Sequence, residues 1–296
     1  MERLTIKDIA RMAGVSHTTV SRALNGARNI RPETYERIME ICRSTGYTLN
    51  AAARQLKRSD SGAIGIIVPD ISNAFFCELT RHLEWLTRQE GRNVFISSSF
   101  YDYDIEDQNI RALMENRVSG IILSGVGDQT YLRLRDYFGK VPIVFLGDNL
   151  PEGMVSQITV NNYEGTYMAA RYLISLGHKK IALMNGNYKE RLYEPEREAG
   201  FRKAMEEAHL PVPPEYLRVC GYSHQDGYRA CGELMSLPDP PTAICTLSDT
   251  RAVGAVRWLK EHKIRIGKDV DIIGFDDVDV SQMVLPEITT VAQPRV

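Results

Sequence analysis

Residues 5–26 read TIKDIARMAGVSHTTVSRALNG and contain two short amphipathic patterns separated by a glycine. Apolar residues recur with helical spacing at Ile6, Ile9, Ala10 and Ala13 and again, after the break, at Val20, Ala23 and Leu24. Thr5 and Asp8 resemble a capping box, Gly14 can take the left-handed turn conformation, and Ser16 can cap the second helix. The spacing therefore predicts a helix-turn-helix.

The second predicted helix has a polar outer face. Because its apolar residues face inward, it must expose His17, Thr18, Ser21, Arg22 and Asn25. An Arg fork can bind guanine, Asn can reach a base or a phosphate, and hydroxyls bind phosphates, with each good base contact contributing about 1–3 kcal/mol of discrimination. The alternative is a merely solvated face, which would more often carry Glu/Lys pairs. We predict that this face reads DNA.

The charge distribution agrees with a nucleic-acid-binding N-terminus. The net charge of the 296-residue chain is −2, but residues 1–60 carry eleven Lys or Arg and six Asp or Glu, which gives +5 and leaves −7 for the remainder. A basic N-terminal part attracts a polyanion, and an acidic remainder repels it.

A third helix and a short basic segment follow. Pro32 suits the first turn of this helix and Gly46 its end, and the apolar stripe is predicted at Tyr35, Ile38, Met39 and either Cys42 or Ile41. The segment NAAARQLKR at residues 50–58 can form a two-turn helix, capped by Asn50, that is too short to be stable alone. If it forms on DNA, Leu56 can wedge into a minor-groove step. The alternative is a plain linker.

The totals are those of an ordinary folded protein. Hydrophobic residues make up 43% of the chain and charged residues 25%, and no apolar run approaches the length of a membrane span or resembles a signal peptide. The five cysteines, Cys42, Cys77, Cys220, Cys231 and Cys245, are scattered and lack CxxC spacing, which argues against disulfide frameworks and zinc modules. We expect a cytoplasmic protein without cofactor or metal.

The helix-turn-helix stretch followed by NAAARQLKR resembles the head and hinge of lactose-repressor (LacI/GalR) family transcription regulators. The resemblance implies a bacterial, nucleoid-associated homodimer that sets two recognition helices in successive major grooves of a double-stranded operator, with paired hinge helices in the minor groove between them. Arg31 stands where the family more usually has a small capping residue. The predicted DNA-binding residues are Thr5, Ser16, His17, Thr18, Ser21, Arg22, Asn25, Asn29, Tyr47, Asn50, Ala53, Leu56 and Lys57.

From residue 62 the pattern changes to short β-branched runs that alternate with helical stretches. The predicted strands are AIGIIV, NVFIS, GIIL, PIVFLG, KIALM, TAICTL and DIIGF. Such alternation predicts an α/β body of two Rossmann-like parallel-sheet subdomains covered by helices, and the two halves meet near residues 157–162.

Several predicted strands end in carboxylates, at Asp70, Asp148, Asp249, Asp276 and Asp277. Ligands of open parallel sheets bind outside the carboxyl ends of the strands, so these groups would converge on one crevice between the halves. Together with Asn73, Arg197 and the rings of Phe75 and Phe76 they suit a small polar ligand such as a sugar.

Each of these residues also has a structural interpretation. Asp70 and Asp249 can simply cap the helix that follows, and Arg197 can belong to a surface ion pair. Of Phe75 and Phe76, we expect one core ring and one pocket ring.

The body also resembles the effector-binding core of the same family, which is similar to periplasmic sugar-binding proteins. The motifs are PDISNAFF, LISLGHKKIALMNG, REAGFRKAM, SDTRAVGAVRWL and DIIGFDD. The resemblance implies effector contacts from Asn73, Phe75, Arg197, Asp249 and Asp276. The full predicted effector set is Asp70, Asn73, Phe75, Phe76, Ser124, Asp148, Arg197, Asp249 and Asp276.

The body departs from the family pattern at three further places. Gly147 stands where the family generally has an aspartate, with Asp148 one place later, and Asn161 stands where Asp is common. The final residues TTVAQPRV end where the family normally continues for another strand and one or more helices. We therefore expect a truncated C-terminus, with consequences for effector binding and dimerisation.

The predicted organisation is a DNA-binding domain at residues 1–49, a hinge helix and linker at 50–61, and an effector-binding domain at 62–296. Within the latter, the N-subdomain takes about 62–160 plus 291–296 and the C-subdomain about 161–290. The predicted function is a transcription regulator, most readily a repressor, controlled by a sugar-like effector. A sugar receptor without specific DNA function is the alternative. An enzyme is not expected, since the chain has no Walker loop, GxSxG elbow or HExxH motif.

Overall fold

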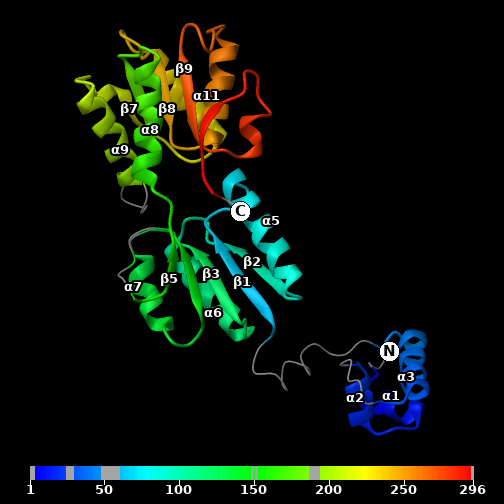
Figure 1. The fold of residues 1–296 in the computed structure, drawn as a ribbon. Coiled ribbons are helices and arrows are strands. Elements are labelled where there is room, and N and C mark those ends of the chain that lie inside the picture. Colours follow the sequence, from blue (N-terminus) through cyan, green and yellow to red (C-terminus); the bar gives the residue numbers. More distant parts are fainter. Residues whose placement is uncertain are drawn as a thin grey trace. The chain divides into compact units, whose positions relative to one another are not determined.

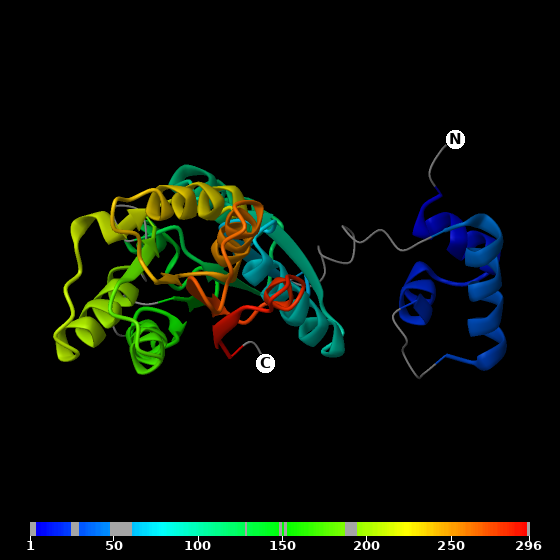
Figure 2. The ribbon, with the colours of Figure 1, turned by 90° about the horizontal axis from the view of Figure 1, so that it is seen from above.

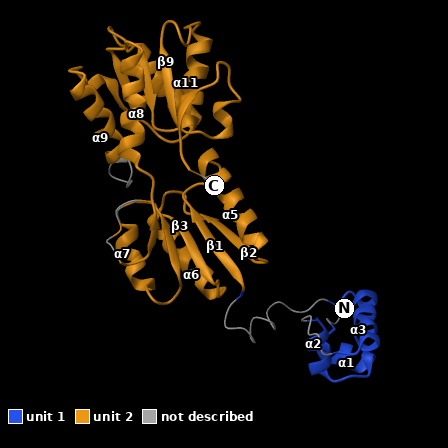
Figure 3. Ribbon diagram, viewed as in Figure 1, with its two compact units in different colours: residues 1–61 blue, residues 62–296 orange. Residues whose placement is uncertain are grey.

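The computed structural model describes residues 4–24, 30–47, 61–127, 129–147, 150, 153–186 and 194–294. The chain divides into two compact units, residues 1–61 and residues 62–296 (Figure 3).

The described part of the first unit contains the helices α1 (Ile6–Ala13), α2 (His17–Leu24) and α3 (Pro32–Thr45) (Figure 1). At the start of α1, the backbone N–H and the hydroxyl of Thr5 both donate to the Asp8 carboxylate, at 2.9 and 2.6 Å. Gly14 ends α1 in the left-handed conformation, with φ 65°, and the Thr19 N–H donates to the Ser16 hydroxyl at 3.1 Å. The predicted helix-turn-helix is confirmed.

A small apolar core joins these three helices. It consists of Ile9, Ala10, Ala13, Val20, Ala23, Ile38 and Cys42. The prediction for α3 was wrong at Tyr35, whose side chain is 40% exposed. The buried stripe runs through Ile38 and Cys42, four residues apart, and Tyr35 lies on its flank. Arg31 occupies the N-cap of α3 and makes no side-chain capping bond, as its departure from the usual small residue suggests.

The second unit contains two lobes, each built on a parallel sheet. The first lobe has the sheet order β2-β1-β3-β4-β5, formed by β1 (Ala63–Val68), β2 (Asn93–Ser98), β3 (Gly120–Ser124), β4 (Ile143–Leu146) and β5 (Ser156–Ile158). Its helices are α5 (Ala74–Gln89), α6 (Tyr103–Glu115) and α7 (Thr130–Leu134), followed by the 3₁₀ turn η1 (Arg135–Tyr137).

The second lobe has the sheet order β10-β9-β8-β6-β7, formed by β6 (Ile181–Asn185), β7 (Leu217–Val219), β8 (Ala243–Thr246), β9 (Asp271–Asp276) and β10 (Thr289–Ala292). Its helices are α8 (Asn162–Ser175), α9 (Glu194–Glu207), α10 (His224–Met235) and α11 (Asp249–Glu261), with the 3₁₀ turns η2 (Pro214–Tyr216) and η3 (Asp279–Ser281). The chain passes from the first lobe to the second between β5 and α8, within the predicted residues 157–162.

Each sheet is covered on both faces, as the parallel pattern requires. In β1, Ile66 and Val68 pack under α5 with Phe76, whereas Ile67 belongs to the cluster under α6 and α7. In the second lobe, Leu183 of β6 belongs to the cluster with residues of α8 and α9, and its neighbour Met184 to the cluster with residues of α10 and α11. Helices lie on both sides of the strands in this lobe (Figure 2). Successive strand residues therefore supply two different cores.

All seven predicted strands are present, and the prediction missed three short ones, β5, β7 and β10. One boundary needs correction: Val291 and Ala292, assigned from the sequence to the first half, pair in parallel with Phe275 and Asp276 of β9 in the second lobe. The four residues of β10 are too few for a clear strand pattern. Among the described residues, no helix is long and apolar enough to cross a membrane.

Close packing of α10 on α11 depends on Gly254. A Cβ atom at this position would lie 1.9 Å from the His224 carbonyl oxygen and 2.7 Å from the Tyr228 nitrogen, both backbone atoms of α10. We expect Gly254→Ala to lower the free energy of unfolding by about 1–3 kcal/mol, because the two helices must move apart. Urea denaturation measures this. Lys260→Ala, on the exposed face of the same helix, should stay within about 0.5 kcal/mol of the wild type. Equal stability of the two variants would contradict the role of Gly254.

Candidate nucleic-acid interface and ligand pocket

The outer face of α2 is polar, and its inner face is built into the core. Val20 and Ala23 are buried, His17, Thr18 and Arg22 are exposed, and Ser21 is half-buried. The predicted orientation is confirmed for His17, Thr18 and Arg22. Whether these side chains contact DNA stays a prediction.

Three other residues of the predicted DNA-binding set have structural tasks in this unit. Thr5 and Ser16 cap helices, and Tyr47 is half-buried against the core, where burial raises the pKa of its phenol. The hydrogen bonds from Thr5 lower the pKa of the Asp8 carboxyl. Asn25, Asn29, Asn50, Ala53, Leu56 and Lys57 lie outside the described residues.

A pocket of about 920 Å³, including its opening to solvent, lies between the two lobes of the second unit. From the first lobe it is lined by the residues at the start of α5 and at the carboxyl ends of β3 and β4, and from the second lobe by those at the ends of β8 and β9. The described lining residues are Asn73, Phe75, Phe76, Leu79, Ser124, Leu146, Gly147, Ile158, Thr159, Val160, Asn162, Arg197, Tyr222, Leu247, Ser248, Arg251, Asp276, Gln293 and Pro294. A pocket at the carboxyl ends of parallel strands is where such folds bind ligands.

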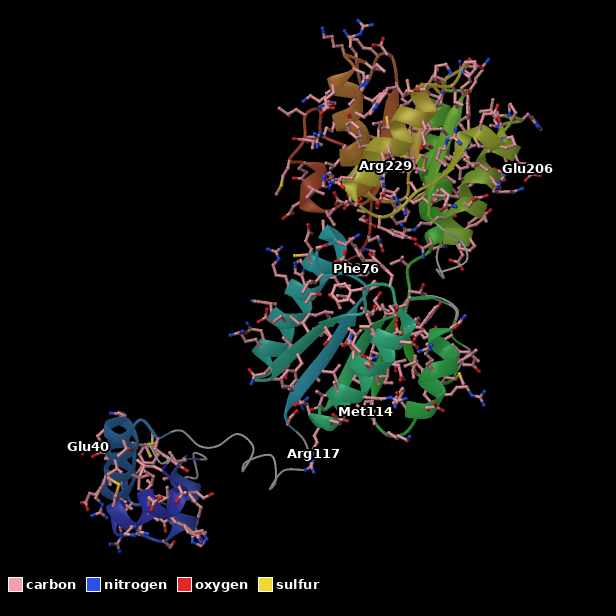
Figure 4. The ribbon with its side chains drawn as sticks, turned by 180° about the vertical axis from the view of Figure 1, so that it is seen from behind. Glu40, Phe76, Met114, Arg117, Glu206 and Arg229 are labelled. Atoms are coloured by element: carbon pink, nitrogen blue, oxygen red, sulfur yellow. The ribbon has the colours of Figure 1, made fainter. Side chains whose placement is uncertain are left out.

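The first lobe presents aromatic and neutral polar groups to the pocket. Asn73 is the N-cap of α5 and accepts a hydrogen bond from the Phe75 N–H at 3.0 Å. The rings of Phe75 and Phe76 meet edge to face, with centroids 5.3 Å apart. Phe76, labelled in Figure 4, lies at the end of α5 nearest the second lobe. Both rings line the pocket, and Phe76 is also part of the core, so one ring does both tasks.

Arg197 is buried at the pocket and is no surface residue. Its Nε donates to Asn162 Oδ1 at 2.8 Å, its Nη1 donates to the Leu247 carbonyl at 2.6 Å, and the guanidinium carbon lies 3.8 Å from the Phe275 ring centroid. The contacts come from α8, from the loop after β8 and from β9. The orientation of this guanidinium is therefore set by three separate segments.

Arg251 is a second buried guanidinium at the pocket, and the sequence interpretation missed it. Its Nε donates to the Gly221 carbonyl at 2.8 Å, and its guanidinium carbon lies 4.4 Å from the Tyr222 ring centroid. In the sequence, Arg251 sits inside an amphipathic helix, where an arginine usually faces solvent. Its side chain is only 1% exposed.

Among the described residues that line the pocket, Asp276 is the one with a carboxyl group. Gln293 Nε2 donates to its Oδ1 at 2.6 Å. Burial is the main cause that raises the pKa of Asp276 to about 7, against a smaller lowering by Arg197. Asp276 and Asp277 both have positive φ, 116° and 58°, a costly backbone conformation that is concentrated at ligand sites.

Two of the predicted carboxylates, Asp249 and Asp70, are not among the residues that line the pocket, and their contact with an effector stays a prediction. Asp249 accepts hydrogen bonds from the Val278 N–H at 2.9 Å and from the Thr290 hydroxyl at 2.5 Å, so it fastens the end of the chain to α11. Its pKa is raised to about 6, chiefly by burial. Asp70 accepts from the N–H and hydroxyl of Ser72, both at 2.8 Å, and shapes the turn before α5. Asp148 lies outside the described residues.

Both parts of the chain match known families. Residues 5–50 match the lacI family of bacterial regulatory proteins, and residues 61–296 match the periplasmic binding proteins and sugar binding domain of the LacI family. The chain belongs to the LacI family.

Relatives of this LacI-family protein cover nearly the whole chain. Catabolite control protein A of Priestia megaterium is 33% identical over 98% of this chain and 88% of its own. The transcriptional repressor PurR of Haemophilus influenzae is 32% identical over 98% and 86%. A crystal structure of the lac repressor dimer bound to operator and an anti-inducer superposes with a TM-score of 0.87 at 26% identity, covering 99% of this chain and 88% of that one. A CelR–cellobiose complex gives 0.70 at 25%, covering 99% and 89%.

Asp276 makes the stability of this LacI-family protein depend on pH. Because burial raises its pKa from 3.8 to about 7, the folded state binds a proton that the unfolded state has lost, and stability falls as pH rises through this window. Asp276→Asn remains neutral, so we expect its Tm to exceed that of the wild type by about 5 °C at pH 8 and by clearly less at pH 5. Differential scanning calorimetry measures both.

A matched control is Asp269→Asn. Asp269 is a surface carboxylate whose pKa is lowered by hydrogen bonds from Arg265, so its loss should not stabilise the protein at pH 8. A gain in Tm at pH 8 for Asp269→Asn, or no gain for Asp276→Asn, would contradict the raised pKa of the buried Asp276 carboxyl group.

Proposed function

We propose that this protein is a sequence-specific DNA-binding transcription repressor that acts as a homodimer and whose operator affinity is controlled by a small-molecule effector. The observation that carries the proposal is the combination of two sites. One is the outward polar face of α2 in a unit of net charge +5, and the other is a pocket between two lobes that is lined by aromatic, polar and charged side chains.

The relatives support each half of the proposal. The lac repressor structure is a dimer bound to operator and to an anti-inducer, CelR is bound to cellobiose, and PurR is a transcriptional repressor. Family members are regulators and not enzymes, which makes a catalytic role for the pocket the less favoured one.

The DNA-contacting residues we propose are those of the predicted set, with His17, Thr18, Ser21 and Arg22 on the described face of α2. The effector contacts we propose are Asn73, Phe75, Phe76, Ser124, Arg197 and Asp276, which all line the pocket. The two rings suit the C–H faces of a sugar, and the amide, hydroxyl and charged groups suit its hydroxyls.

The proposed mechanism is a shift between two arrangements of the lobes. A ligand in the pocket touches both lobes, so it favours the arrangement in which those contacts are made together. The residues between the two units then couple this arrangement to operator binding. The coupling free energy between effector binding and operator binding is typically about 1–3 kcal/mol. Its sign is given by whether the ligand weakens or strengthens DNA binding.

Arg22 is the residue on which base recognition depends most in this proposal. Selection from a random duplex library with the wild-type protein should enrich one palindromic motif, and binding to that duplex should weaken steeply with salt. We expect Arg22→Ala to weaken binding to the selected duplex by about tenfold or more and to remove discrimination against a scrambled duplex, because a bidentate base contact is lost. Gel shifts at two salt concentrations measure both effects.

Arg43→Ala is the matched control. Arg43 is an exposed arginine in the last turn of α3, so its removal lowers the charge equally but should preserve sequence discrimination. Circular dichroism checks the fold of each variant. Only non-specific binding by the wild-type protein would favour the alternative, a sugar receptor without DNA function.

Arg197 is the pocket residue whose loss should uncouple the ligand from DNA. After a thermal-shift screen of sugars, sugar phosphates and nucleobases, any hit is added to the gel shift. We expect Arg197→Ala to abolish the ligand response and to leave DNA affinity within about threefold, because α2 lies in the other unit. Since Arg197 also holds three segments together, Ser124→Leu provides a second variant that fills the pocket from the first lobe. A normal ligand response in a folded Ser124→Leu protein would refute the assigned pocket.

A further inference from the structure

We infer that Tyr101 of the first lobe is a positioning residue of the effector site. It holds the ring of Tyr222 in the wall of the pocket when the two lobes lie close together, and in this way it couples ligand binding to the arrangement of the lobes. The inference rests on the proposed function, in which the interlobe pocket is the effector site.

Among the described lining residues, Tyr222 is the aromatic side chain that the second lobe presents to the pocket. It lies in the loop between β7 and α10, and both ends of this loop are anchored. The Cys220 N–H donates to the Asn185 carbonyl at 2.8 Å. The Ser223 hydroxyl caps α10 and accepts from the Asp226 N–H at 3.1 Å. These anchors fix the backbone, whereas the orientation of the ring depends on what it packs against.

The ring of Tyr222 has contacts from both lobes. From its own lobe, the guanidinium carbon of Arg251 lies 4.4 Å from the ring centroid. From the first lobe, the Tyr101 ring stacks on it, with centroids 5.4 Å apart and planes 25° apart, which is within the range of favourable aromatic pairs. The contact from Arg251 lies within one lobe and persists when the lobes move as rigid bodies. The stack of Tyr101 on Tyr222, the interlobe tyrosine pair, forms only when the lobes are close.

The turn that carries Tyr101, between β2 and α6, has an unusual backbone. Phe100 and Tyr101 have φ values of 52° and 61°, a conformation that is costly for bulky side chains and is concentrated at functional sites. The Phe100 N–H donates to the Pro69 carbonyl at 2.8 Å. The Asp102 N–H donates to the Ser99 carbonyl at 2.9 Å. The first lobe therefore sets the position of Tyr101 by its own hydrogen bonds.

A hydrogen bond joins the same two lobes at other segments. The Asp279 N–H donates to Glu78 Oε1 at 2.7 Å, which connects η3 of the second lobe to α5 of the first. The interlobe tyrosine pair connects the turn before α6 to the loop before α10. Contacts between different segments fix the relative orientation of the lobes better than either contact alone.

The interlobe tyrosine pair and a ligand favour the same arrangement. A ligand that touches Phe75 of the first lobe and Tyr222 of the second needs the lobes close together, as the pair does. Loss of the pair lowers the fraction of molecules in this arrangement, and the apparent affinity for the ligand falls by the same factor. For one aromatic pair this factor is about threefold to tenfold.

Hydrogen–deuterium exchange of the full-length chain tests the pair without any ligand. We expect Tyr101→Asn to speed amide exchange at residues 219–224 of the second lobe by about threefold to tenfold, because the loop loses the ring that supports Tyr222. Asparagine tolerates the left-handed conformation, so this variant removes the ring and keeps the turn. Tyr222→Leu is the reciprocal variant and should speed exchange at residues 99–102 of the first lobe.

Phe100→Asn is the matched control. Phe100 is the neighbour of Tyr101 in the same turn and has the same left-handed backbone, but its side chain is 68% exposed. Its loss should leave exchange at residues 219–224 unchanged. Tyr101→Phe keeps the ring and should stay within about twofold of the wild type. Circular dichroism checks the fold of each variant.

Ribose, cellobiose and glucose 6-phosphate are the probes for the ligand side of the inference. The probe that raises the Tm of the wild-type protein most is titrated by isothermal titration calorimetry. We expect Tyr101→Asn to bind it about threefold to tenfold more weakly. Phe100→Asn and Tyr101→Phe should bind it within about twofold of the wild type.

Unchanged exchange at residues 219–224 in a folded Tyr101→Asn protein overturns the inference, and so does an equal change in Phe100→Asn. Faster exchange together with an unchanged ligand affinity overturns the positioning role, since the pair would then be a structural contact only. Failure of the proposed function gives a different result. A probe that binds the wild-type protein but leaves the gel shift unchanged contradicts the effector role, whereas the exchange data on the interlobe tyrosine pair still stand.

Discussion

The structure of the ligand-binding unit depends on how the guanidinium of Arg197 is held. It joins Asn162, in the first turn after the crossover between the lobes, to the Leu247 carbonyl beyond β8, and it lies on the ring of Phe275 in β9. An arginine this deeply buried is tolerated only with good hydrogen-bond partners, and here these partners are the elements that border the pocket. One side chain thus sets both the exit of the crossover and one wall of the ligand site.

Much of the fold was predictable because its signals are local. The caps of α1 and α2, the left-handed Gly14 and the alternation of strands with helices each depend on a few neighbouring residues, and all are present. The strands β5 and β7 were missed because three residues carry no clear period, and β10 was missed for the same reason at four residues. Tyr35 was misplaced because helical spacing alone does not tell the flank of an apolar stripe from its centre.

The pocket was predictable in place but not in chemistry. Strand ends identified the correct edge of each sheet, and Asn73, Phe75, Phe76, Ser124, Arg197 and Asp276 all reach it. Asp249 and Asp70 were assigned to the ligand because a carboxylate after a strand looks the same in the sequence whether it faces the pocket or a backbone N–H. The burial of Arg251 could not be predicted from the neighbouring sequence. The residues that contact its guanidinium, Gly221 and Tyr222, lie about 30 residues away in the chain.

The hydrogen bond between Glu78 and the backbone of Asp279 links positions 201 residues apart, from α5 in the first lobe to η3 in the second. Glu78 lies in the turn after Asn73, Phe75 and Phe76, which line the pocket, so the same helix borders the cavity and is hydrogen-bonded to the second lobe. The first turn of α5 and the interlobe hydrogen bond of Glu78 are separated by a single turn of the helix. One helix is therefore common to the ligand pocket and to a hydrogen bond between the lobes.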